Sequence, residues 1–550
     1  MSRFTLMLLF SCMAFLLLML NMMNISCTYI VELNVFVLSS VNFSVLIILD
    51  KISLSFGFVV TLISSCVFAF AKNYMIEDLF YNRFIIILLS FVLSMNLLIF
   101  SGSILMILLG WDGLGITSFA LIIYYQNKDS LAAGFLTMIV NRIGDVVIVS
   151  SMILMLMLGQ FSIFPMSLNM NMLVIFLVVA SLTKSAQYPF SPWLPAAMAA
   201  PTPVSALVHS STLVTAGVYL SIRLSFNIPL SNESMSLLCF CGSMTCLLGG
   251  AAAICEMDLK KIIALSTLSQ LGVMMFSLGM NFPFMALFHL YTHAMFKALL
   301  FLVAGMVLMM SFGTQDLRLL GGILMKSPIL IVFQNISSLC LIGAPFMSAF
   351  YSKHAILELM VMSNINLFSV LVMILATICT AIYVFRSLKI LCWGKIYINL
   401  NSNYEMSYFI PLLVLSLMGV MSGKMYLYLN SSVVAMMYLP FSWNMFINMS
   451  TIIGMSIGLL LVSAVKSNML SSLLYLTPSL NKMVKPYSIV SKNMKFLDYG
   501  WLEPKFMLYP NFFKLINFIY NFLIWPSVNM YVWIRSVIIL SIVFFMCYYM

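Results

Sequence analysis

The sequence predicts an all-α, polytopic membrane protein that crosses the bilayer about 15 or 16 times. Two features of its composition support this prediction: 63% of the 550 residues are hydrophobic and only 7% are charged, and the mean hydropathy is +1.11. In addition, apolar runs of about 20 residues, the length that spans a bilayer as a helix, recur along the whole chain. No stretch between these runs is long enough for a soluble domain of ordinary size.

Residues 1–100 predict plain transmembrane helices, of which the first covers the run from Phe4 to Leu20. This run lacks a convincing processing site and further apolar runs follow it, so we interpret it as a retained helix and not as a cleaved signal or transit peptide. Five charged residues of the region are typical of loops and helix ends, and we assign them no chemistry: Asp50, Lys51, Glu77, Asp78 and Arg83.

Beyond residue 100, ionisable residues, glycines and prolines fall within apolar runs, so we predict that residues 101–395 form the functional core. Asp112 is the first of these residues, in an apolar helix whose glycines would let a neighbouring helix approach closely. Arg142 and Asp145 follow at a helical spacing of three, which is typical of an ion pair. We expect Asp145 to serve either this structural pair or proton uptake.

Lys184 ends an apolar run, and five prolines follow it in the stretch of about 15 residues from Pro189 to Pro203. Proline removes a helical hydrogen bond, so this segment predicts a helix that is interrupted in or near the membrane. After the interruption, Val204–Leu220 predicts an apolar helix that carries His209 together with several serines and threonines. These residue types are typical of a polar channel between helices.

A second set of ionisable residues follows. Asp258 and Lys260 open a predicted helix, and His289, His293 and Lys297 then stand four residues apart. This spacing places the last three on one face of a membrane helix. A charged side chain at the bilayer centre costs about 2.5 to 3.5 kcal/mol on insertion scales, so three ionisable groups on one face indicate a proton or ion path.

Lys353 completes the second set, because Gly343 and Pro345 again interrupt a helix beside a lysine. Two halves that each pair an interrupted helix with a buried lysine are typical of the internal repeats of transporters. Other interpretations stay open. Lys184 and Lys353 could each snorkel to the membrane surface. The histidines could be packed core residues or a metal pair, although the His-Glu-x-x-His motif is absent.

Missing motifs argue against several function classes. The 11 cysteines are scattered through apolar stretches without a Cys-x-x-Cys pair, so we interpret them as small core residues. The sequence has no dinucleotide fingerprint and no phosphate-binding loop, so we expect no metal and no cofactor on this chain. The net charge of +11 is dispersed between apolar runs, which favours membrane topology over nucleic-acid binding.

Four long motifs resemble those of a known family: Leu-Gly-Trp-Asp-Gly-Leu-Gly around Asp112, Asn-Arg-Ile-Gly-Asp ending at Asp145, Lys-Ser-Ala-Gln-Tyr-Pro-Phe from Lys184, and Asp-Leu-Lys-Lys-Ile-Ile-Ala-Leu-Ser-Thr from Asp258. They are similar to chain 5 of mitochondrial NADH:ubiquinone oxidoreductase, the distal antiporter-like subunit of respiratory complex I. The resemblance is dense from about residue 101 to 360.

The resemblance implies two inverted helix bundles, each with a discontinuous helix, in the mitochondrial inner membrane. It also implies a proton path through the residues that match the family's acid, lysines and histidines: Asp112, Lys184, His209, His289, His293, Lys297 and Lys353. The accessory candidates are Arg142, Asp145, Asp258, Lys260 and His354.

Two positions depart from the family's pattern. Asp112 stands where glutamate is common and is one methylene shorter, so packing or water must close its distance to Lys184. His354 stands where aspartate commonly follows the lysine, so the sequence does not identify the group that stabilises Lys353 in its charged form. A histidine there could instead relay the proton outward.

The mechanism that these residues imply is electrostatic. Desolvation favours a neutral lysine and a nearby carboxylate favours a charged one, so moving a carboxylate relative to Lys184 can load or release a proton. The resemblance implies that quinone reduction in other subunits supplies the energy, and that FMN, the iron–sulfur clusters and ubiquinone are bound there. It implies the other membrane-arm subunits as partners, especially the adjacent antiporter-like subunit, together with membrane lipids.

The rest of the chain predicts additional transmembrane helices over 396–480, an amphipathic segment over 481–530 and a final span over 531–550. Lysines interleave with aromatic residues in the amphipathic segment, which is typical of a helix at the membrane interface. The resemblance implies a lateral helix that runs along sister subunits and ends in an anchoring helix. A surface helix that grips anionic lipid is the alternative.

Three other functions are weighed against this one. A cation/proton antiporter complex of the same fold shares many of the motifs, although few carboxylates are present to bind sodium. A scaffold would use its polar residues only to tie helices together, and replacing Lys184 would then impair assembly more than pumping. A quinone-reducing catalytic subunit is disfavoured, because the sequence offers no cofactor ligands.

Overall fold

A computed structural model describes residues 3–25, 28–38, 41–157, 159, 162, 171–363, 366–395, 406–429, 441–461, 468–476, 479, 482 and 491–495. The chain divides into two compact units, Met1–Thr477 and Pro478–Met550, and the first holds every element named below. The predicted lateral helix over 481–530 falls almost entirely outside the described residues. The predicted final span over 531–550 falls wholly outside them.

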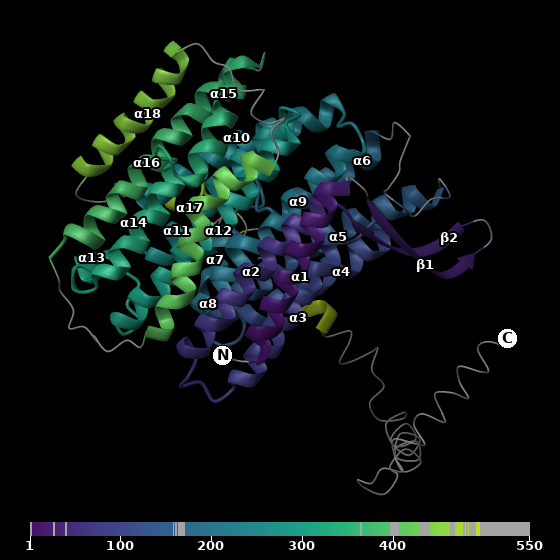
Figure 1. Ribbon diagram of the computed structural model, residues 1–550, viewed down its shortest axis with the longest axis horizontal. Helices are drawn as coiled ribbons and strands as arrows, with labels where there is room; N and C mark the ends of the chain where they lie inside the picture. The colour runs from purple at the N-terminus through teal and green to yellow at the C-terminus, as the bar shows by residue number, and fades with distance from the viewer. Residues whose placement is uncertain are drawn as a thin grey trace, which may run out of the picture. The chain divides into compact units, whose positions relative to one another are not determined.

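Helices make up most of the first unit (Figure 1). The longer ones are α1 (Arg3–Ile25), α2 (Lys51–Tyr74), α3 (Tyr81–Ile99), α4 (Ile104–Ile122), α5 (Lys128–Met157), α6 (Asn171–Lys184), α9 (Leu213–Asn227), α10 (Asn232–Cys255), α11 (Leu259–Gly279), α12 (Pro283–Met310), α14 (Pro328–Ile342), α16 (Leu367–Trp393), α17 (Phe409–Leu429) and α18 (Phe441–Leu460). The shorter ones are α7 (Trp193–Ala196), η1 (Ala197–Ala199), α8 (Thr202–Val204), η2 (Ser205–Thr212), α13 (Leu317–Leu320), η3 (Ile323–Lys326), η4 (Phe350–His354), α15 (Ala355–Met362), η5 (Met406–Tyr408) and α19 (Asn468–Ser471).

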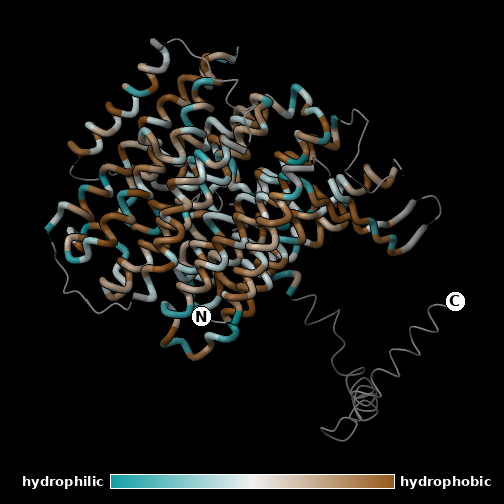
Figure 2. Tube along the Cα trace, viewed as in Figure 1, coloured by the Kyte–Doolittle hydropathy of each residue, from teal (hydrophilic) through white to brown (hydrophobic). Residues whose placement is uncertain are grey.

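Eleven helices in the described part of the chain are long and apolar enough to cross a membrane, and three shorter apolar helices accompany them. Figure 2 shows apolar residues along most of these helices. The predicted class, an all-α polytopic membrane protein, is therefore confirmed. The predicted total of about 15 or 16 spans also counts the final one, which lies outside the described residues.

One N-terminal segment is a β-hairpin, where the sequence predicts only transmembrane helices over residues 1–100. Strand β1 (Tyr29–Leu38) pairs antiparallel with β2 (Val41–Leu49), with one irregularity between Asn34 and Phe36. The prediction is wrong for this segment. Its composition explains the difference, because valine, isoleucine, phenylalanine and tyrosine favour strands and Glu32 and Asn34 interrupt the first apolar run.

Both predicted helix interruptions are present. In the first half α6 ends at Lys184, and after the proline-rich segment the chain resumes through α8, the π-helical stretch η2 and α9. In the second half α14 ends at Ile342, and the next residue is Gly343, whose φ of 87° favours glycine. The chain then passes through a second π-helical stretch, η4, which carries Lys353. Such stretches are frequent at functional sites.

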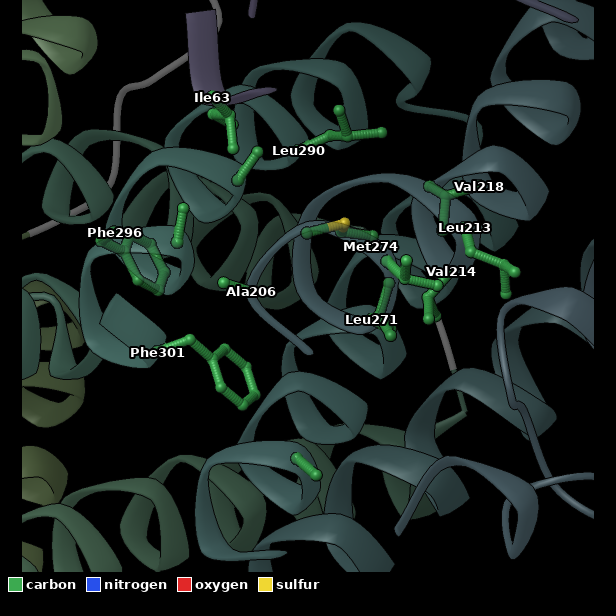
Figure 3. Close-up of a cluster of buried hydrophobic side chains, with 14 of the residues drawn as sticks. Ile63, Ala206, Leu213, Val214, Val218, Leu271, Met274, Leu290, Phe296 and Phe301 are labelled. Carbon is green, nitrogen blue, oxygen red and sulfur yellow. The ribbon is translucent and has the colours of Figure 1, made fainter. Parts of the chain in front are cut away.

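The interior of the first unit is packed from α2, α9, α11 and α12. Figure 3 shows apolar side chains from these helices, among them Ile63, Leu213, Met274 and Phe296, and all four are buried. Burial of such side chains excludes water from the surroundings of any polar group placed among them. The polar residues of the site therefore need hydrogen-bond partners in the protein itself or in enclosed water.

Glycines let α10 and α11 contact each other along their backbones. A Cβ atom added at Gly242 would lie 2.6 Å from the backbone nitrogen of Phe276, and one added at Gly272 would lie 2.6 Å from the backbone nitrogen of Cys246. Small residues at such contacts are typical of membrane helix pairs. We call this contact the α10–α11 seam, and it leaves no room for a larger side chain at either glycine.

Candidate functional site

Arg142 lies between two carboxylates in the first half of the site. Its Nη1 on α5 donates to Oδ2 of Asp145 at 2.9 Å, and the same nitrogen lies 3.6 Å from Oδ1 of Asp112 on α4. The side chains of Arg142 and Asp112 are 45% and 33% exposed, so this cluster lies partly at the surface of the protein, on α4 and α5. The predicted ion pair between Arg142 and Asp145 is confirmed, with Asp112 as a third member.

Lys184 is fully buried at the end of α6. Its Nζ donates to the main-chain carbonyl of Trp111 at 2.6 Å and lies 4.0 Å from the centre of the Trp111 indole, a cation–π distance. The snorkelling alternative does not hold for this lysine. Among the described residues no ion pair within 4.0 Å joins it to Asp112, so direct contact does not close the distance between them.

His209 is buried in η2. The indole of Trp193 stands edge-on to its ring, with the ring centres 6.3 Å apart. Neither ring nitrogen has a hydrogen-bond partner among the described residues. His209 therefore lies in the interior, but no direct hydrogen bond joins it to the other candidates.

The face of α12 that carries the three predicted ionisable residues is enclosed by protein. His289, His293 and Lys297 are all fully buried, and the rings of the two histidines lie 6.3 Å apart. Nζ of Lys297 donates to the hydroxyl of Ser266 on α11 at 2.5 Å. Neither nitrogen of His293 has a partner in the described part of the chain. The described residues hold no group of three or more histidine, cysteine or acidic side chains placed to bind a metal.

A hydrogen-bonded chain passes through His289 from α11 to η4. Its Nε2 bonds to Oε1 of Gln270 at 3.2 Å, and its Nδ1 bonds to the hydroxyl of Ser352 at 2.9 Å. Ser352 also bonds to Thr292 at 3.2 Å and directly precedes Lys353. A histidine that is bonded at both nitrogens can take a proton on one side and release one on the other.

Lys353 is also buried, with 3% of its surface exposed, so snorkelling does not hold for it either. Its Nζ donates to the hydroxyl of Thr380 at 3.1 Å and lies 3.5 Å from the carbonyl of Ile342. Within the described residues no carboxylate lies within 4.0 Å of this amine. The sequence does not identify the partners of the Lys353 amine, and in the structure they are a hydroxyl and a backbone carbonyl.

His354 pairs with Glu358 and not with Lys353. Its Nδ1 lies 3.0 Å from Oε1 of Glu358, one helical turn away, and the two side chains are 11% and 13% exposed. Lys353 and His354 both line a cavity of about 120 Å³ that reaches residues of α18. His354 thus lies beside Lys353 at this cavity. Its partner Glu358 is an acid that the sequence analysis did not single out.

Asp258 and Lys260, at the start of α11, are not joined to the buried lysines by any described contact. Asp258 pairs with the half-exposed Lys261 at 2.6 Å, and Lys260 donates to the carbonyl of Ala200 at 3.2 Å. In the loop facing Asp258, the hydrogen bonds of Arg318 hold the pKa of Asp316 below its usual value. These contacts stabilise the end of the bundle.

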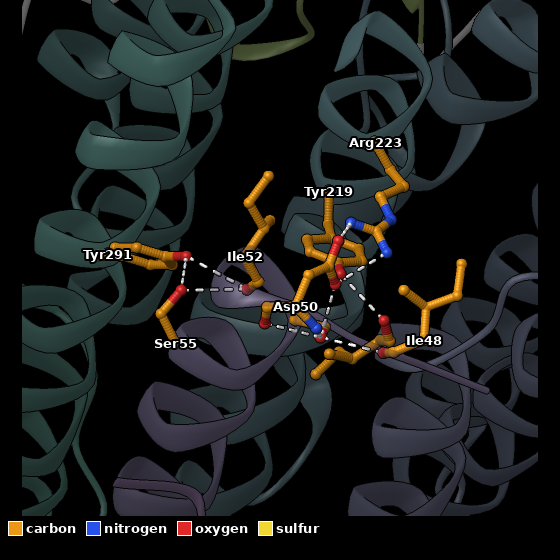
Figure 4. A network of polar contacts seen from close by, with 9 residues as sticks. Ile48, Asp50, Ile52, Ser55, Tyr219, Arg223 and Tyr291 are labelled. Atoms are coloured by element: carbon orange, nitrogen blue, oxygen red, sulfur yellow. Dashed lines mark hydrogen bonds and ion pairs between the residues drawn. The ribbon is translucent and has the colours of Figure 1, made fainter. Parts of the chain in front are cut away.

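A largely buried ion pair between α9 and Asp50, the residue before α2, was not predicted. Arg223 bonds Asp50 twice, from Nη1 to Oδ2 at 2.5 Å and from Nη2 to Oδ1 at 3.0 Å. Figure 4 shows this pair beside Tyr219 and the hydroxyl contact of Ser55 with Tyr291, at 2.5 Å. Two-point pairing is the strong form of an arginine–carboxylate contact. It ties the start of α2 to the resumed helix of the first half.

Interrupted helices with lysines buried at their breaks define the class of antiporter-like membrane subunits. The chain matches the family described as NADH:quinone oxidoreductase/Mrp antiporter over residues 101–379. It also matches the N-terminal region of chain 5 of complex I over residues 36–85. The chain therefore belongs to the family of NADH-ubiquinone oxidoreductase chain 5, and it is a multi-pass protein of the mitochondrial inner membrane.

Relatives named NADH-ubiquinone oxidoreductase chain 5 resemble most of the chain. That of Anopheles quadrimaculatus is 44% identical over 79% of this chain and 77% of its own length. That of Locusta migratoria is 42% identical over 86% and 87%. That of Lumbricus terrestris is 40% identical over 88% of both.

Two solved structures share the fold. A chain of the Mrp complex from a Dietzia species superposes with a TM-score of 0.71 at 20% identity, and the match covers 95% of this chain and 61% of that chain. A chain of an archaeal membrane-bound sulfane sulfur reductase superposes with a TM-score of 0.70 at 18% identity, over 83% of this chain and 93% of that chain.

Proposed function

We propose that this chain carries protons across the inner mitochondrial membrane as an antiporter-like membrane-arm subunit of NADH:ubiquinone oxidoreductase. One observation supports the proposal most directly. The amines of Lys184, Lys297 and Lys353 are buried and, in the described part of the chain, bond only to neutral oxygen atoms. A buried ammonium that bonds to no carboxylate is costly, so burial brings the charged and neutral forms of such an amine closer together in free energy and lets the amine exchange a proton.

In the second half the route runs through neutral groups. Lys353 follows Ser352, which bonds to His289, and His289 bonds in turn to Gln270. Lys297 reaches the same helix, α11, through Ser266. Hydroxyl, imidazole and amine groups can each accept one proton and give up another, so Ser352, His289, Ser266 and the two lysines can each act as a relay. Among the described residues no direct hydrogen bond joins Lys353 to Ser352 or Gln270 to Ser266, so a proton needs a further group to cross these two gaps.

In the first half the carboxylates supply the electrostatic control. Arg142 contacts both Asp145 and Asp112, and the residue before Asp112 accepts the hydrogen bond of Lys184. Charge exposed in a membrane span is costly, so a neighbouring subunit is expected to cover this cluster. We propose that the subunit that covers this cluster is the adjacent antiporter-like subunit. A change of charge in that neighbour would then shift the carboxylates and alter the proton affinity of Lys184.

We propose that FMN, the iron–sulfur clusters and ubiquinone are bound by other subunits, whose quinone reduction supplies the energy. The absence of a dinucleotide fingerprint and of Cys-x-x-Cys pairs in the sequence supports this part. Contact along the lateral helix is a further part of the proposal, and its residues lie almost entirely outside those that the structure describes.

Replacing Lys184 by alanine in assembled complex tests the proposal. We expect proton pumping to fall by roughly an order of magnitude or more, because the amine that exchanges the proton is removed. Lys128→Ala is the matched control, since Lys128 is exposed at the start of α5. Pumping, electron transfer and assembly are measured on the same samples. Normal pumping in Lys184→Ala would overturn the path, and loss of assembly alone would favour the scaffold function.

A further inference from the structure

A small cavity lies between α11, α12, α14 and α16, and Ser266, the hydrogen-bond partner of Lys297, is one of its lining residues. Its volume is about 40 Å³. The first turns of α11, the last turns of α12 and Leu317 of α13 line it, so it lies toward the end of the bundle where Asp258 is bridged to Asp316. Ser387, another lining residue, is only half-buried, so the cavity begins close to the protein surface.

The cavity suits water in both size and chemistry. A buried water needs roughly 10 to 15 Å³ of such space, so the volume of about 40 Å³ holds roughly three. A buried water also needs about three hydrogen bonds. The polar side chains on the walls can supply them: Ser266, Gln334, Ser338, Tyr383 and Ser387.

Tyr383 brings an unpartnered hydroxyl to this cavity. The residue is 1% exposed, and its hydroxyl has no hydrogen-bond partner among the described residues. The side chains of Ser269, Gln270 and Ser266 lie close enough to interact with this hydroxyl, but none of them meets the geometry of a hydrogen bond. A buried hydroxyl seldom goes without a partner, so this one is suited to bind a water in the cavity.

The position of Tyr383 also joins two parts of the site that no direct hydrogen bond connects. Ser266 accepts the hydrogen bond of Lys297, and Oε1 of Gln270 accepts that of Nε2 of His289. Both side chains lie on α11 near the Tyr383 hydroxyl. A phenol can donate one hydrogen bond while it accepts another, which is the property that a relay between water and an amine requires.

We infer that the cavity is a water-binding site and that Tyr383 relays protons between this water and Lys297. The inference rests on the proposed function. It adds a point where protons enter from water and one further residue, Tyr383, to the proposed path. In one transfer, a hydronium ion in the cavity gives a proton to the Tyr383 oxygen. The phenol proton moves to the Ser266 hydroxyl, whose own proton moves to the neutral amine of Lys297. The products are water, two unchanged hydroxyls and an ammonium, so protons and charge balance.

Tyr383→Phe in the assembled complex tests the relay, because it removes the hydroxyl and keeps the ring. We expect protons pumped per electron to fall roughly threefold or more, with assembly unchanged. Tyr219→Phe is the matched control: it removes a buried hydroxyl that donates to the carbonyl of Ile99, outside the cavity. Ser387→Leu is a second variant, which fills the cavity from its rim and should lower pumping in the same way.

Lys297→Ala in the same assay separates this inference from the proposed function. Loss of pumping in Lys297→Ala with normal pumping in both Tyr383→Phe and Ser387→Leu would overturn the relay and leave the proton path standing. Normal pumping in Lys297→Ala would instead count against the proton path itself. If Tyr383→Phe failed to assemble, Ser387→Leu alone would decide: reduced pumping supports the relay's water access, and normal pumping overturns it.

Discussion

The two halves of the site surround their lysines with different chemistry. In the first half, Lys184 lies next to a cluster of two carboxylates and an arginine that is partly exposed on α4 and α5. In the second half, Lys297 and Lys353 are enclosed, and their partners among the described residues are hydroxyls and a backbone carbonyl. The first half can therefore respond to charge outside the chain, and the second is built to pass a proton on.

The difference follows from how the two kinds of contact act over distance. A Coulomb interaction between two charges at 4 Å is about 4 kcal/mol at the effective dielectric constant of a protein surface, and it acts without contact. A hydrogen bond acts only between touching groups, but a series of them can transmit a proton. Each half of the site uses one of these two properties.

Breaking the hydrogen-bonded series should have the largest effect. His289→Phe keeps the ring volume but removes both nitrogens, which bond to Gln270 and Ser352. We expect pumping to fall by roughly an order of magnitude or more. His209→Phe is the matched comparison, because His209 has no hydrogen-bond partner in the described residues to lose. Measured in assembled complex, equal losses in the two variants would contradict the contrast between the halves.

Giving the second half a carboxylate should make it resemble the first. Thr380→Asp places an acid where the hydroxyl now accepts from Lys353. A charge pair of about 4 kcal/mol would raise the proton affinity of the amine by roughly a thousandfold and hold it charged. We expect pumping to fall severalfold and to recover when the solution is made more alkaline. Thr380→Asn is the neutral control, and an equal loss in both variants would argue against a charge effect.

Removing the cation from the first half should have an intermediate effect. In Arg142→Gln, the carboxylates of Asp112 and Asp145 no longer share an arginine, and their mutual repulsion is not offset. We expect a severalfold loss of pumping, with partial recovery in Arg142→Lys, which keeps the charge but not the planar fork. Pumping that is unchanged in Arg142→Gln would show that the cluster only stabilises the helices.

Lengthening the acid should have the smallest effect. Asp112→Glu adds one methylene, which can bring the carboxylate from 3.6 Å to hydrogen-bonding distance of Arg142. Its partly exposed position leaves room for the longer chain, so we expect pumping to change by less than roughly twofold. Asp112→Asn, which removes the charge, provides the comparison in the same pumping assay. A loss in Asp112→Glu as large as that in Asp112→Asn would show that length, and not charge, is what this position requires.

Sequence periodicity was sufficient to predict the features that are local along the chain. Lysines beside helix breaks and three ionisable groups four residues apart are patterns within a single segment, and the structure buries Lys184, His289, His293, Lys297 and Lys353 accordingly. The runs of apolar residues likewise predicted the membrane helices. In each of these cases one helix, or one helix and its end, carries the whole signal.

Features that join distant segments were not predictable in this way. Asp50 pairs with Arg223, 173 residues further along the chain, and Ser352 and Gln270 approach His289 from two other elements. A serine or a glutamine in a predicted membrane helix does not show by itself which side chain it will bond to. The β-hairpin was missed for another reason, since a short apolar run rich in valine and isoleucine suits a strand and a membrane helix about equally.

The α10–α11 seam has a consequence for how this protein behaves when it is taken out of its membrane. Backbones that touch at Gly242 and Gly272 leave no gap that an acyl chain or a detergent tail could enter. Detergent must therefore coat outward-facing surfaces such as that of α1, where Met7, Phe10 and Met13 are exposed. The helix pair at the seam should be extracted as one piece, and lipids that remain ordered after purification should be found on those outer surfaces.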